Sequence, residues 1–238
     1  MPCYSLEVSE QFPLITDLPL AYRERPGAQG APTIVLLHGL GSNELDLLGL
    51  QPLLDERFHL VSVRAPREMG GNAFGWFDIE WTPEPVPNLE QAQESITTLR
   101  RFLGELGDRH QLTPERLLLM GFSQGAMLSY ILALREPERY GGVIAMSGRI
   151  PPQLAQDSLP DHNGLPVLVT HGTHDEVIPV SYARRSRALL ERLNVDLEYR
   201  EYPMGHHLTQ ECLDDITDWL GGRSEEHTSE LQSQDGIS

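Results

Sequence analysis

Apolar segments rich in β-branched residues alternate with longer segments of helical periodicity along most of this chain. Uninterrupted apolar runs of five to seven residues are typical of strands that are buried on both faces. We expect such strands at residues 33–37, 59–63, 116–121, 142–146, 166–170 and 196–202. Their alternation with helices predicts an α/β fold, in which a mostly parallel central sheet carries helices on both faces.

The expected helices span residues 89–109, 124–135, 179–193 and 209–220. In the first of them, apolar residues recur at helical spacing from Ile96 to Leu106, and Asn88 is in place to cap its first turn. Two weaker strands, at 4–8 and 18–23, are expected to add an antiparallel edge. Little sequence lies between these elements, so we expect a single catalytic domain over residues 1–222 with a minimal cap.

Residues 223–238 differ from the rest of the chain because they are polar and show no periodicity. Their run RSEEHTSELQS resembles the in-frame translation of a common short-read sequencing adapter. We therefore expect a non-native or disordered tail here, with the native C-terminus lost near Gly222, and leave it out of the fold prediction.

The overall charge and the cysteine content exclude several classes of protein. A formal net charge of -17 disfavours nucleic acid and anionic membrane surfaces as partners. No segment reaches transmembrane length and residues 1–12 lack a signal-like pattern, which favours the cytoplasm. Cys3 and Cys212 form no disulfide framework, and no histidine pair shows metal-ligand spacing with a third ligand. We expect no metal, no cofactor, and a monomer or homodimer.

The pentapeptide Gly121-Phe122-Ser123-Gln124-Gly125 lies between the apolar strand 116–121 and the helix 124–135. A serine on a sharp strand-to-helix turn needs small neighbours, and the two glycines supply them. The turn also places the serine at a helix N-terminus, where developing negative charge is stabilised. This context predicts that Ser123 is a nucleophile.

A serine hydroxyl requires a general base and a group that orients the base. Asp175 follows the strand 166–170, where catalytic acids of open α/β sheets lie, and the adjacent Glu176 is the alternative acid. His206 follows the strand 196–202 and is the expected base, with the adjacent His207 as the alternative. The order serine, acid, histidine therefore predicts a catalytic triad.

A tetrahedral intermediate needs hydrogen-bond donors for its oxyanion. The residue after the nucleophile, Gln124, offers one backbone N–H. The loop His38-Gly39-Leu40-Gly41 follows the strand 33–37 and offers the second, from Leu40. Gly41 would let the backbone approach a substrate closely.

Six motifs taken together resemble the phospholipase/carboxylesterase family, which includes acyl-protein thioesterases. They are LLHGLGSNELDL, RAP followed by FGWFDI, GFSQGAM, AMSG, HGTHDEVIP and YPMGHH, and the resemblance spans about residues 20–220. It implies the α/β-hydrolase fold, with Ser123, Asp175 and His206 in the triad and Leu40 and Gln124 in the oxyanion hole. The FGWFDI segment is more similar to the bacterial esterase branch.

The expected function is that of a serine carboxylesterase that cleaves small, short- to medium-chain esters through an acyl-enzyme. An acyl-protein thioesterase or lysophospholipase is the alternative, and a non-catalytic binding module is a further one. Residues 64–87 form a long Gly- and Pro-rich segment, which is typical of a functional loop. We expect its Trp76 and Phe77 to line the acyl side of the substrate site, although such aromatic residues can equally be packing anchors.

The remaining histidines are expected to be structural or exposed. His38 and His171 each precede a glycine at a strand end and should orient loops through hydrogen bonds. The other three, His59, His110 and His162, are expected at the surface. We leave open the role of Arg149, which follows the AMSG motif.

Overall fold

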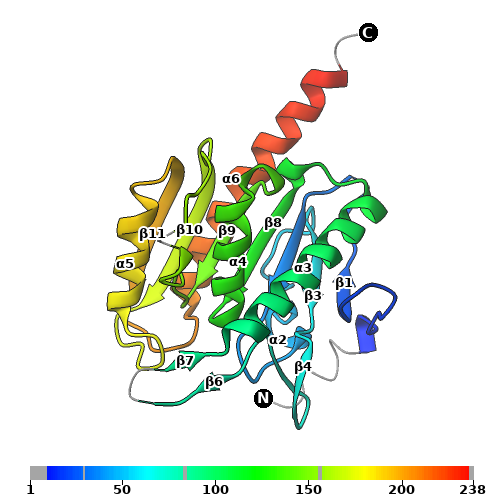
Figure 1. Cartoon of the computed structure of the whole chain (residues 1–238). Coiled ribbons are helices and arrows are strands. Elements are labelled where there is room, and N and C mark those ends of the chain that lie inside the picture. Colours follow the sequence, from blue (N-terminus) through cyan, green and yellow to red (C-terminus); the bar gives the residue numbers. More distant parts are fainter. Residues whose placement is uncertain (1–9, 29, 83–84, 155–156, 236–238) are drawn as a thin grey trace.

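The computed structural model describes residues 10–28, 30–82, 85–154 and 157–235, with side chains as far as Gly222. Its centre is a seven-stranded sheet in the order β1-β3-β2-β8-β9-β10-β11 (Figure 1). These strands are β1 (Tyr22–Arg25), β2 (Thr33–Leu37), β3 (His59–Val63), β8 (Leu117–Phe122), β9 (Gly142–Met146), β10 (Leu165–Gly172) and β11 (Val195–Tyr202). All neighbours run parallel except β1, which is antiparallel to β3. The predicted parallel sheet with an antiparallel edge is confirmed, and the expected strand 4–8 lies outside the described residues.

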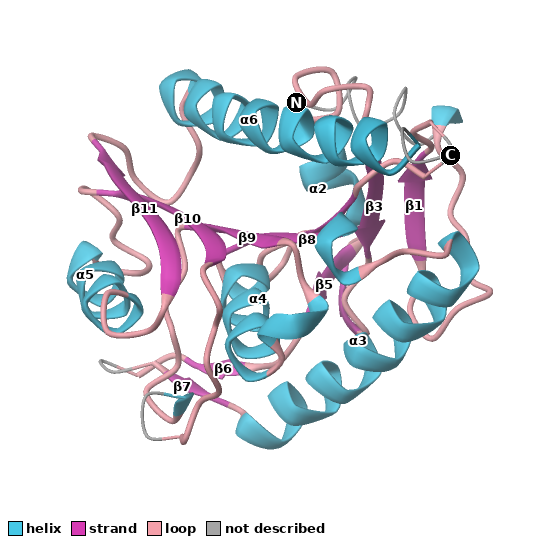
Figure 2. Cartoon of the chain, turned by 90° about the horizontal axis from the view of Figure 1, so that it is seen from above, coloured by secondary structure: helices cyan, strands magenta, loops and turns pink. Residues whose placement is uncertain are grey.

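Helices cover both faces of the sheet (Figure 2). One face carries α3 (Leu89–His110), α4 (Gln124–Arg135) and α5 (Val180–Leu190), and the other carries α2 (Glu44–Leu48) and α6 (Gln210–Asp235). Two single-turn 3-10 helices, Pro114–Arg116 and Pro137–Arg139, precede β8 and β9. None of the described helices is both long enough and apolar enough to cross a membrane. The three-layer arrangement is the one predicted.

The core is divided by the sheet into two apolar clusters. In β2, Val35 and Leu37 pack in the cluster that includes α3 and α4, while Ile34 and Leu36 pack in the cluster that includes α2 and α6. Successive side chains of a strand point to opposite faces, so a strand covered on both sides must be apolar at every position. This is why the buried strands read as continuous apolar runs.

The segment between β3 and α3 holds two small antiparallel ladders that the sequence pattern does not reveal. In the first, β4 (Arg67–Gly70) pairs with β5 (Ala73–Gly75), and in the second β6 (Ile79–Glu80) pairs with β7 (Val86–Pro87). Strands of two to four residues are too short to show a period. The segment is therefore a folded wall beside the sheet.

Three helices depart from the sequence prediction by more than one residue. The helix expected at 179–193 is shorter, because α5 spans Val180–Leu190. The short α2 was not expected, and it begins where the Asn43 side chain accepts a hydrogen bond from the Leu45 N–H. At the other end, α6 continues to Asp235 instead of ending at Leu220. No glycine or proline occurs from 223 to 235 to interrupt it. The foreign origin of residues 223–238 stays a prediction.

Candidate active site

Ser123 occupies a strained turn between β8 and α4. Its backbone has φ 54° and ψ -113°, a region that non-glycine residues rarely adopt. The two glycines of the motif permit the turn because a Cβ on Gly121 would lie 2.4 Å from the Gly125 carbonyl group, and one on Gly125 would lie 1.9 Å from the Leu37 oxygen. The turn is held by the Ser123 N–H, which donates to the Met146 carbonyl at 2.9 Å. Close packing thus fixes the position of the hydroxyl.

Three polar side chains meet at the carboxyl ends of three parallel strands. Ser123 follows β8, Asp175 follows β10, and His206 follows β11. The Ser123 Oγ lies 3.0 Å from the His206 Nε2, and the His206 Nδ1 lies 2.7 Å from the Asp175 Oδ2. This chain of contacts is the geometry that a hydroxyl needs in order to lose its proton to an imidazole.

Asp175 is fixed by more than its contact with His206. Its Oδ1 accepts hydrogen bonds from the backbone N–H groups of Val177 and Ile178, at 2.9 and 2.8 Å. Burial acts to raise the pKa of the carboxyl, but the hydrogen bonds from His206 and Ile178 outweigh it and hold the pKa below its ordinary value. The group is therefore an anion at neutral pH, and an anion selects the tautomer with hydrogen on Nδ1.

The two alternatives left open by the sequence lie apart from this chain of contacts. Glu176 is exposed and lines the rim of the adjoining cavity, without a hydrogen bond to His206. His207 is also exposed, and it makes no hydrogen bond within the described part of the chain. His206 is thus the member of its pair that contacts Ser123, and Asp175 is the member of its pair that contacts His206.

The backbone N–H groups of Leu40 and Gln124 are both available beside Ser123. Neither has a hydrogen-bond partner among the described residues, and both residues line the same cavity as Ser123 and His206. The first N–H groups of a helix have no partner within the helix, which explains the free donor of Gln124 at the start of α4. Two free donors beside a nucleophile can bind an oxyanion.

The side chain of Gln124 has a role that the motif did not indicate. Its Oε1 accepts from the Trp76 N–H at 3.1 Å, and its Nε2 donates to the Phe77 carbonyl at 2.7 Å. The residue whose backbone N–H is available beside Ser123 therefore also binds, through its side chain, the segment at Trp76 and Phe77. The glutamine inside the motif was the one signal in the sequence for this second role. Its side-chain partners could not be found from the sequence, because they lie about 50 residues away.

The predicted substrate-contacting residues are not all at the cavity. Phe77 lines it, whereas Trp76 is fully buried, and its Nε1 donates to the His38 carbonyl at 2.9 Å. Gly41 has φ 78° and donates its N–H to the Phe74 carbonyl. Neither Trp76 nor Gly41 lines the cavity, since Trp76 is fully buried and Gly41 is exposed outside it.

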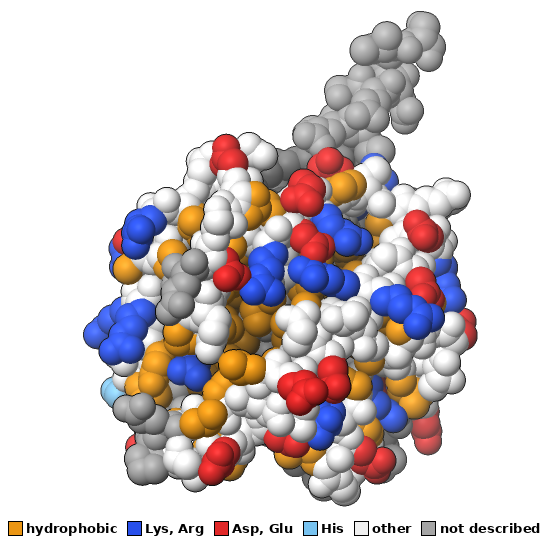
Figure 3. All heavy atoms as spheres, viewed as in Figure 1, with side chains coloured by type: hydrophobic (Ala, Val, Ile, Leu, Met, Phe, Trp, Pro, Cys, Tyr) orange, Lys and Arg blue, Asp and Glu red, His pale blue; other side chains and the backbone are white. Residues whose placement is uncertain are grey.

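A cavity of about 620 Å³ opens beside Ser123. Its walls are mainly apolar, and they include Phe77, Ile79, Trp81, Met127, Ile178 and Pro179, together with Pro87 of β7 and Tyr182 of α5. Figure 3 shows apolar side chains gathering on the face that carries β6 and β7, where Trp81 and Val86 are exposed. An apolar cavity beside a polar reaction centre suits the acyl chain of an ester.

Arg149 adds a positive charge to this apolar cavity. Its guanidinium lies over the Tyr182 ring, 4.7 Å from the centroid, and both residues line the cavity. It forms no ion pair with any carboxylate of the described residues, although the exposed Glu176 lies on the same cavity's rim. An unpaired guanidinium can bind an anionic group of a substrate.

The remaining histidines differ in part from what the sequence suggested. His38 accepts from the Ala65 N–H, and the Nε2 of His171 contacts the Ile178 carbonyl at 2.7 Å, so both orient loops. The expectation of a surface position is wrong for His162 and His59, which are buried. A carbonyl of Leu134 satisfies His162, and Glu24 satisfies His59. The sequence could not indicate that these two histidines are buried, because their hydrogen-bond partners lie 28 and 35 residues away.

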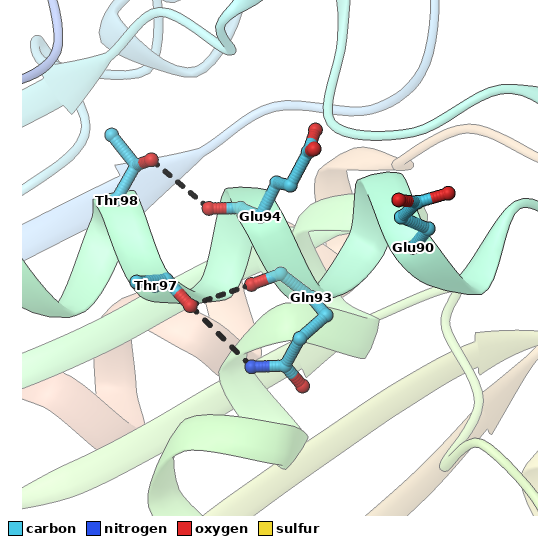
Figure 4. Close-up of a pocket in the computed structure, with 5 residues that line it drawn as sticks. All are labelled: Glu90, Gln93, Glu94, Thr97 and Thr98. Atoms are coloured by element: carbon cyan, nitrogen blue, oxygen red, sulfur yellow. Dashed lines mark hydrogen bonds between the residues drawn. The ribbon is translucent and has the colours of Figure 1, made fainter.

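A second hollow lies on the outer face of α3 (Figure 4). It is lined by Glu90, Gln93, Glu94, Thr97 and Thr98, all from this one helix. Thr97 and Thr98 donate to the backbone carbonyls of Gln93 and Glu94, four residues earlier. The threonine hydroxyls are thus satisfied by the helix backbone, and the five side chains converge on no common point, so the hollow offers no site for chemistry.

The fold and this site are those of an α/β-hydrolase. A model of the phospholipase/carboxylesterase family matches residues 23–222. The chain therefore belongs to the phospholipase/carboxylesterase family, which places it among the carboxylic-ester hydrolases.

Relatives and solved structures agree with this family. Acyl-protein thioesterase 1 of Gibberella zeae is 27% identical over 216 residues, which cover 81% of this chain and 91% of that protein. The crystal structure of esterase PE8 has a TM-score of 0.73 and 31% identity, covering 84% of this chain and 96% of that one. A carboxylesterase from Mesorhizobium loti has a TM-score of 0.77 and 25% identity, covering 89% and 99%.

Proposed function

We propose that this protein is a serine carboxylesterase that hydrolyses short- to medium-chain esters of small molecules through an acyl-enzyme. The observation that carries the proposal is the contact chain from the Ser123 Oγ to the His206 Nε2 and from the His206 Nδ1 to Asp175. The cavity beside Ser123 supports an acyl chain as the group that is bound. The cytoplasmic location and the monomer or homodimer state expected from the sequence stay predictions.

In the first half of the reaction, the Ser123 Oγ attacks the ester carbonyl carbon while its proton passes to the His206 Nε2. The negative charge on the carbonyl oxygen is stabilised by the N–H groups of Leu40 and Gln124. As the tetrahedral intermediate collapses, the bond to the alcohol oxygen breaks and His206 returns the proton to that oxygen. The alcohol leaves, and an ester of Ser123 remains.

In the second half, a water molecule gives a proton to the His206 Nε2 and attacks the acyl carbon. The same two N–H groups hold the second oxyanion. The bond to the Ser123 Oγ then breaks, Ser123 regains its proton from His206, and the carboxylic acid is released. Asp175 remains an anion throughout and stabilises the imidazolium that forms twice in each cycle.

A series of p-nitrophenyl esters of increasing acyl length tests the proposal. The wild type should cleave the short and medium members, and Ser123→Ala should lose about 10⁴- to 10⁶-fold in kcat. Labelling by a fluorophosphonate should disappear in the same variant. The matched control is Ser158→Ala, an exposed serine whose loss should leave both readouts unchanged. Labelling that persists in Ser123→Ala would show that another residue is the nucleophile.

A thioesterase activity is the second candidate, because acyl-protein thioesterases are among the relatives. The same serine, imidazole and oxyanion donors can cleave either bond. Oxygen esters and thioesters of equal acyl length should be compared by their kcat/KM. A higher value for the thioester would reverse the order of the two candidates. A lysophospholipid belongs in the same comparison, and absence of all hydrolysis would favour a binding module.

A further inference from the structure

Two histidines and a glutamate meet at the antiparallel edge of the sheet, away from Ser123. Glu24 lies on β1, His59 is the first residue of β3, and His110 is the last residue of α3. Figures 1 and 2 both show α3 running toward the side of the sheet where β1 lies. His59 lies at the amino end of its strand, whereas Ser123 follows the carboxyl end of β8, so the cluster and the candidate active site lie at opposite ends of the parallel strands.

The ligand atoms of the three side chains are close enough to share one ion. The Oε2 of Glu24 lies 3.1 Å from the His59 Nε2 and 3.8 Å from the His110 Nε2. The two imidazole rings meet edge to face with centroids 4.6 Å apart, and one ligand atom from each residue lies within 4.8 Å of the others. Tetrahedral zinc with bonds of about 2.0–2.1 Å separates its ligands by a little more than 3 Å.

The Nε2 of His110 is the second observation that points to a ligand. It is buried and has no hydrogen-bond partner among the described residues, although it faces the Glu24 carboxylate. Buried polar atoms nearly always have a hydrogen-bond partner or a ligand. A bound ion would satisfy the His110 Nε2. The neighbouring Arg109 does not fill the place, because it is bonded to Asp17 and the Tyr22 hydroxyl.

We propose that Glu24, His59 and His110 form a binding site for a divalent cation of the zinc type, with water completing the coordination. Two imidazoles and one carboxylate favour zinc and its neighbours in the transition series over magnesium or calcium, which prefer oxygen ligands. The side chains of His110 and Glu24 are 24% and 25% exposed, so an ion can enter from solvent. The ion would join the edge strand β1 to β3 and to the end of α3.

Each residue would supply one ligand atom, an oxygen from Glu24 and an Nε2 from each imidazole. A histidine binds a metal ion through a nitrogen that carries no hydrogen, so both rings would hold their hydrogen on Nδ1. The histidines were expected to be exposed and no metal was expected, because residues so far apart in sequence show no ligand spacing.

The test uses the full chain without a polyhistidine tag, stripped of metal with a chelator and then dialysed. Zinc chloride is titrated in a calorimeter, and thermal unfolding is followed with and without zinc. One zinc ion per chain should bind, and a saturating concentration should raise Tm by roughly 5 °C. Magnesium chloride at the same concentration should leave Tm unchanged.

Two variants with a matched control locate the ion. His110→Ala and Glu24→Gln should each lose the calorimetric signal and the zinc-induced rise in Tm, while kcat/KM for a p-nitrophenyl ester stays unchanged. Comparing each variant with and without zinc removes any effect on the apo fold. The control His207→Ala should bind zinc as the wild type does. Absence of zinc binding in the wild type, or binding that survives in His110→Ala and disappears in His207→Ala, would overturn the proposal.

Discussion

Two imidazole–carboxylate pairs lie at opposite ends of the strands of this sheet, and they differ in the third residue that each pair contacts. His206 lies 2.7 Å from Asp175, and His59 lies 3.1 Å from Glu24. The third member of the first pair is the Ser123 hydroxyl, which can donate a proton to an imidazole. The third member of the second pair is the His110 imidazole, whose Nε2 has no hydrogen-bond partner in the described part of the chain. Similar pairs therefore suit proton transfer in one place and cation binding in the other.

The two carboxylates also differ in how firmly they are held. The Asp175 side chain is fully buried and accepts two backbone N–H bonds besides its contact with His206. The Glu24 side chain is 25% exposed, and among the residues that the structure describes its hydrogen bond is to His59 alone. A carboxylate that must hold an imidazole in one tautomer throughout a reaction needs a fixed orientation, whereas a carboxylate that binds a metal ion can adjust to the ion.

Replacing each carboxylate by its amide should give the largest difference in kcat between the two pairs. Asp175→Asn should lower kcat about 10⁴-fold, because the amide stabilises the wrong tautomer of His206 and cannot stabilise its cation. Glu24→Gln should leave kcat within about twofold, since it lies away from the reacting atoms. The measurement is steady-state kinetics on one p-nitrophenyl ester, with circular dichroism to verify folding. Equal losses of kcat in the two variants would show that the two pairs do not differ in their role in catalysis.

Two glycines offer a similar contrast in stability. Gly125→Ala places a Cβ 1.9 Å from the Leu37 oxygen, so the turn beneath Ser123 must open, at a loss of about 3 kcal/mol or more. Gly107→Ala, in the helix that ends at His110, meets nothing within 4 Å and should gain about 0.5–1 kcal/mol. Urea denaturation gives both values. A Gly125→Ala protein as stable as the wild type would mean that the elbow is not closely packed.

Acid should weaken both pairs, and Asp175 more than Glu24. The folded-state pKa of each carboxyl is lowered, so its hydrogen bonds stabilise the fold above the unfolded-state pKa and are lost as the pH falls through the folded-state pKa. At pH 7 the free energy of unfolding of the wild type should exceed that of Asp175→Asn by about 2 kcal/mol and that of Glu24→Gln by less than about 1 kcal/mol.

Both differences should shrink below about pH 4, where the unfolded-state carboxyls take up protons. Urea denaturation at pH 7 and pH 3, in the presence of a chelator, measures them. A difference for Asp175→Asn that grows on acidification would have the opposite sign to that expected of a lowered pKa.

Two arginines near the two pairs should differ in their effect on substrate choice. Arg149 lies in the cavity without an ion pair among the described carboxylates, whereas Arg109 is paired with Asp17. Arg149→Leu should lower kcat/KM about fivefold for an ester whose acyl group ends in a carboxylate, relative to the neutral ester of equal length. Arg109→Leu should leave this ratio unchanged. A constant ratio in Arg149→Leu would assign the guanidinium to packing on Tyr182.

The sequence was informative wherever a function or a fold depends on local pattern. The expected strands 33–37, 59–63 and 142–146 and the helix 124–135 have the bounds seen in β2, β3, β9 and α4. The residues expected to form a triad lie within hydrogen-bonding distance, with His206 between Ser123 and Asp175. Ser123 and Asp175 could be placed because they follow buried strands. His206 follows β11, which was expected to be buried but is mostly half-buried because it forms the edge of the sheet.

The rest depended on contacts between segments distant in sequence. Trp76 was expected at the substrate site, but a carbonyl of His38 and the amide of Gln124 hold it in the interior. His59 looked like a surface residue because Glu24, its partner, lies on an antiparallel strand whose pairing no local pattern encodes. The cluster with His110 arises only when the end of α3 reaches that edge.

The side chain of Gln124 limits how this site can be altered. Because the residue whose backbone N–H faces the cavity beside Ser123 also binds Trp76 and Phe77 through its side chain, a shift at Trp76 and Phe77 will displace that N–H as well. Attempts to widen the cavity there should therefore change turnover together with selectivity. Arg149 and Tyr182 make no hydrogen bond to Gln124 among the described residues, so substitutions at these two positions should change selectivity at constant turnover.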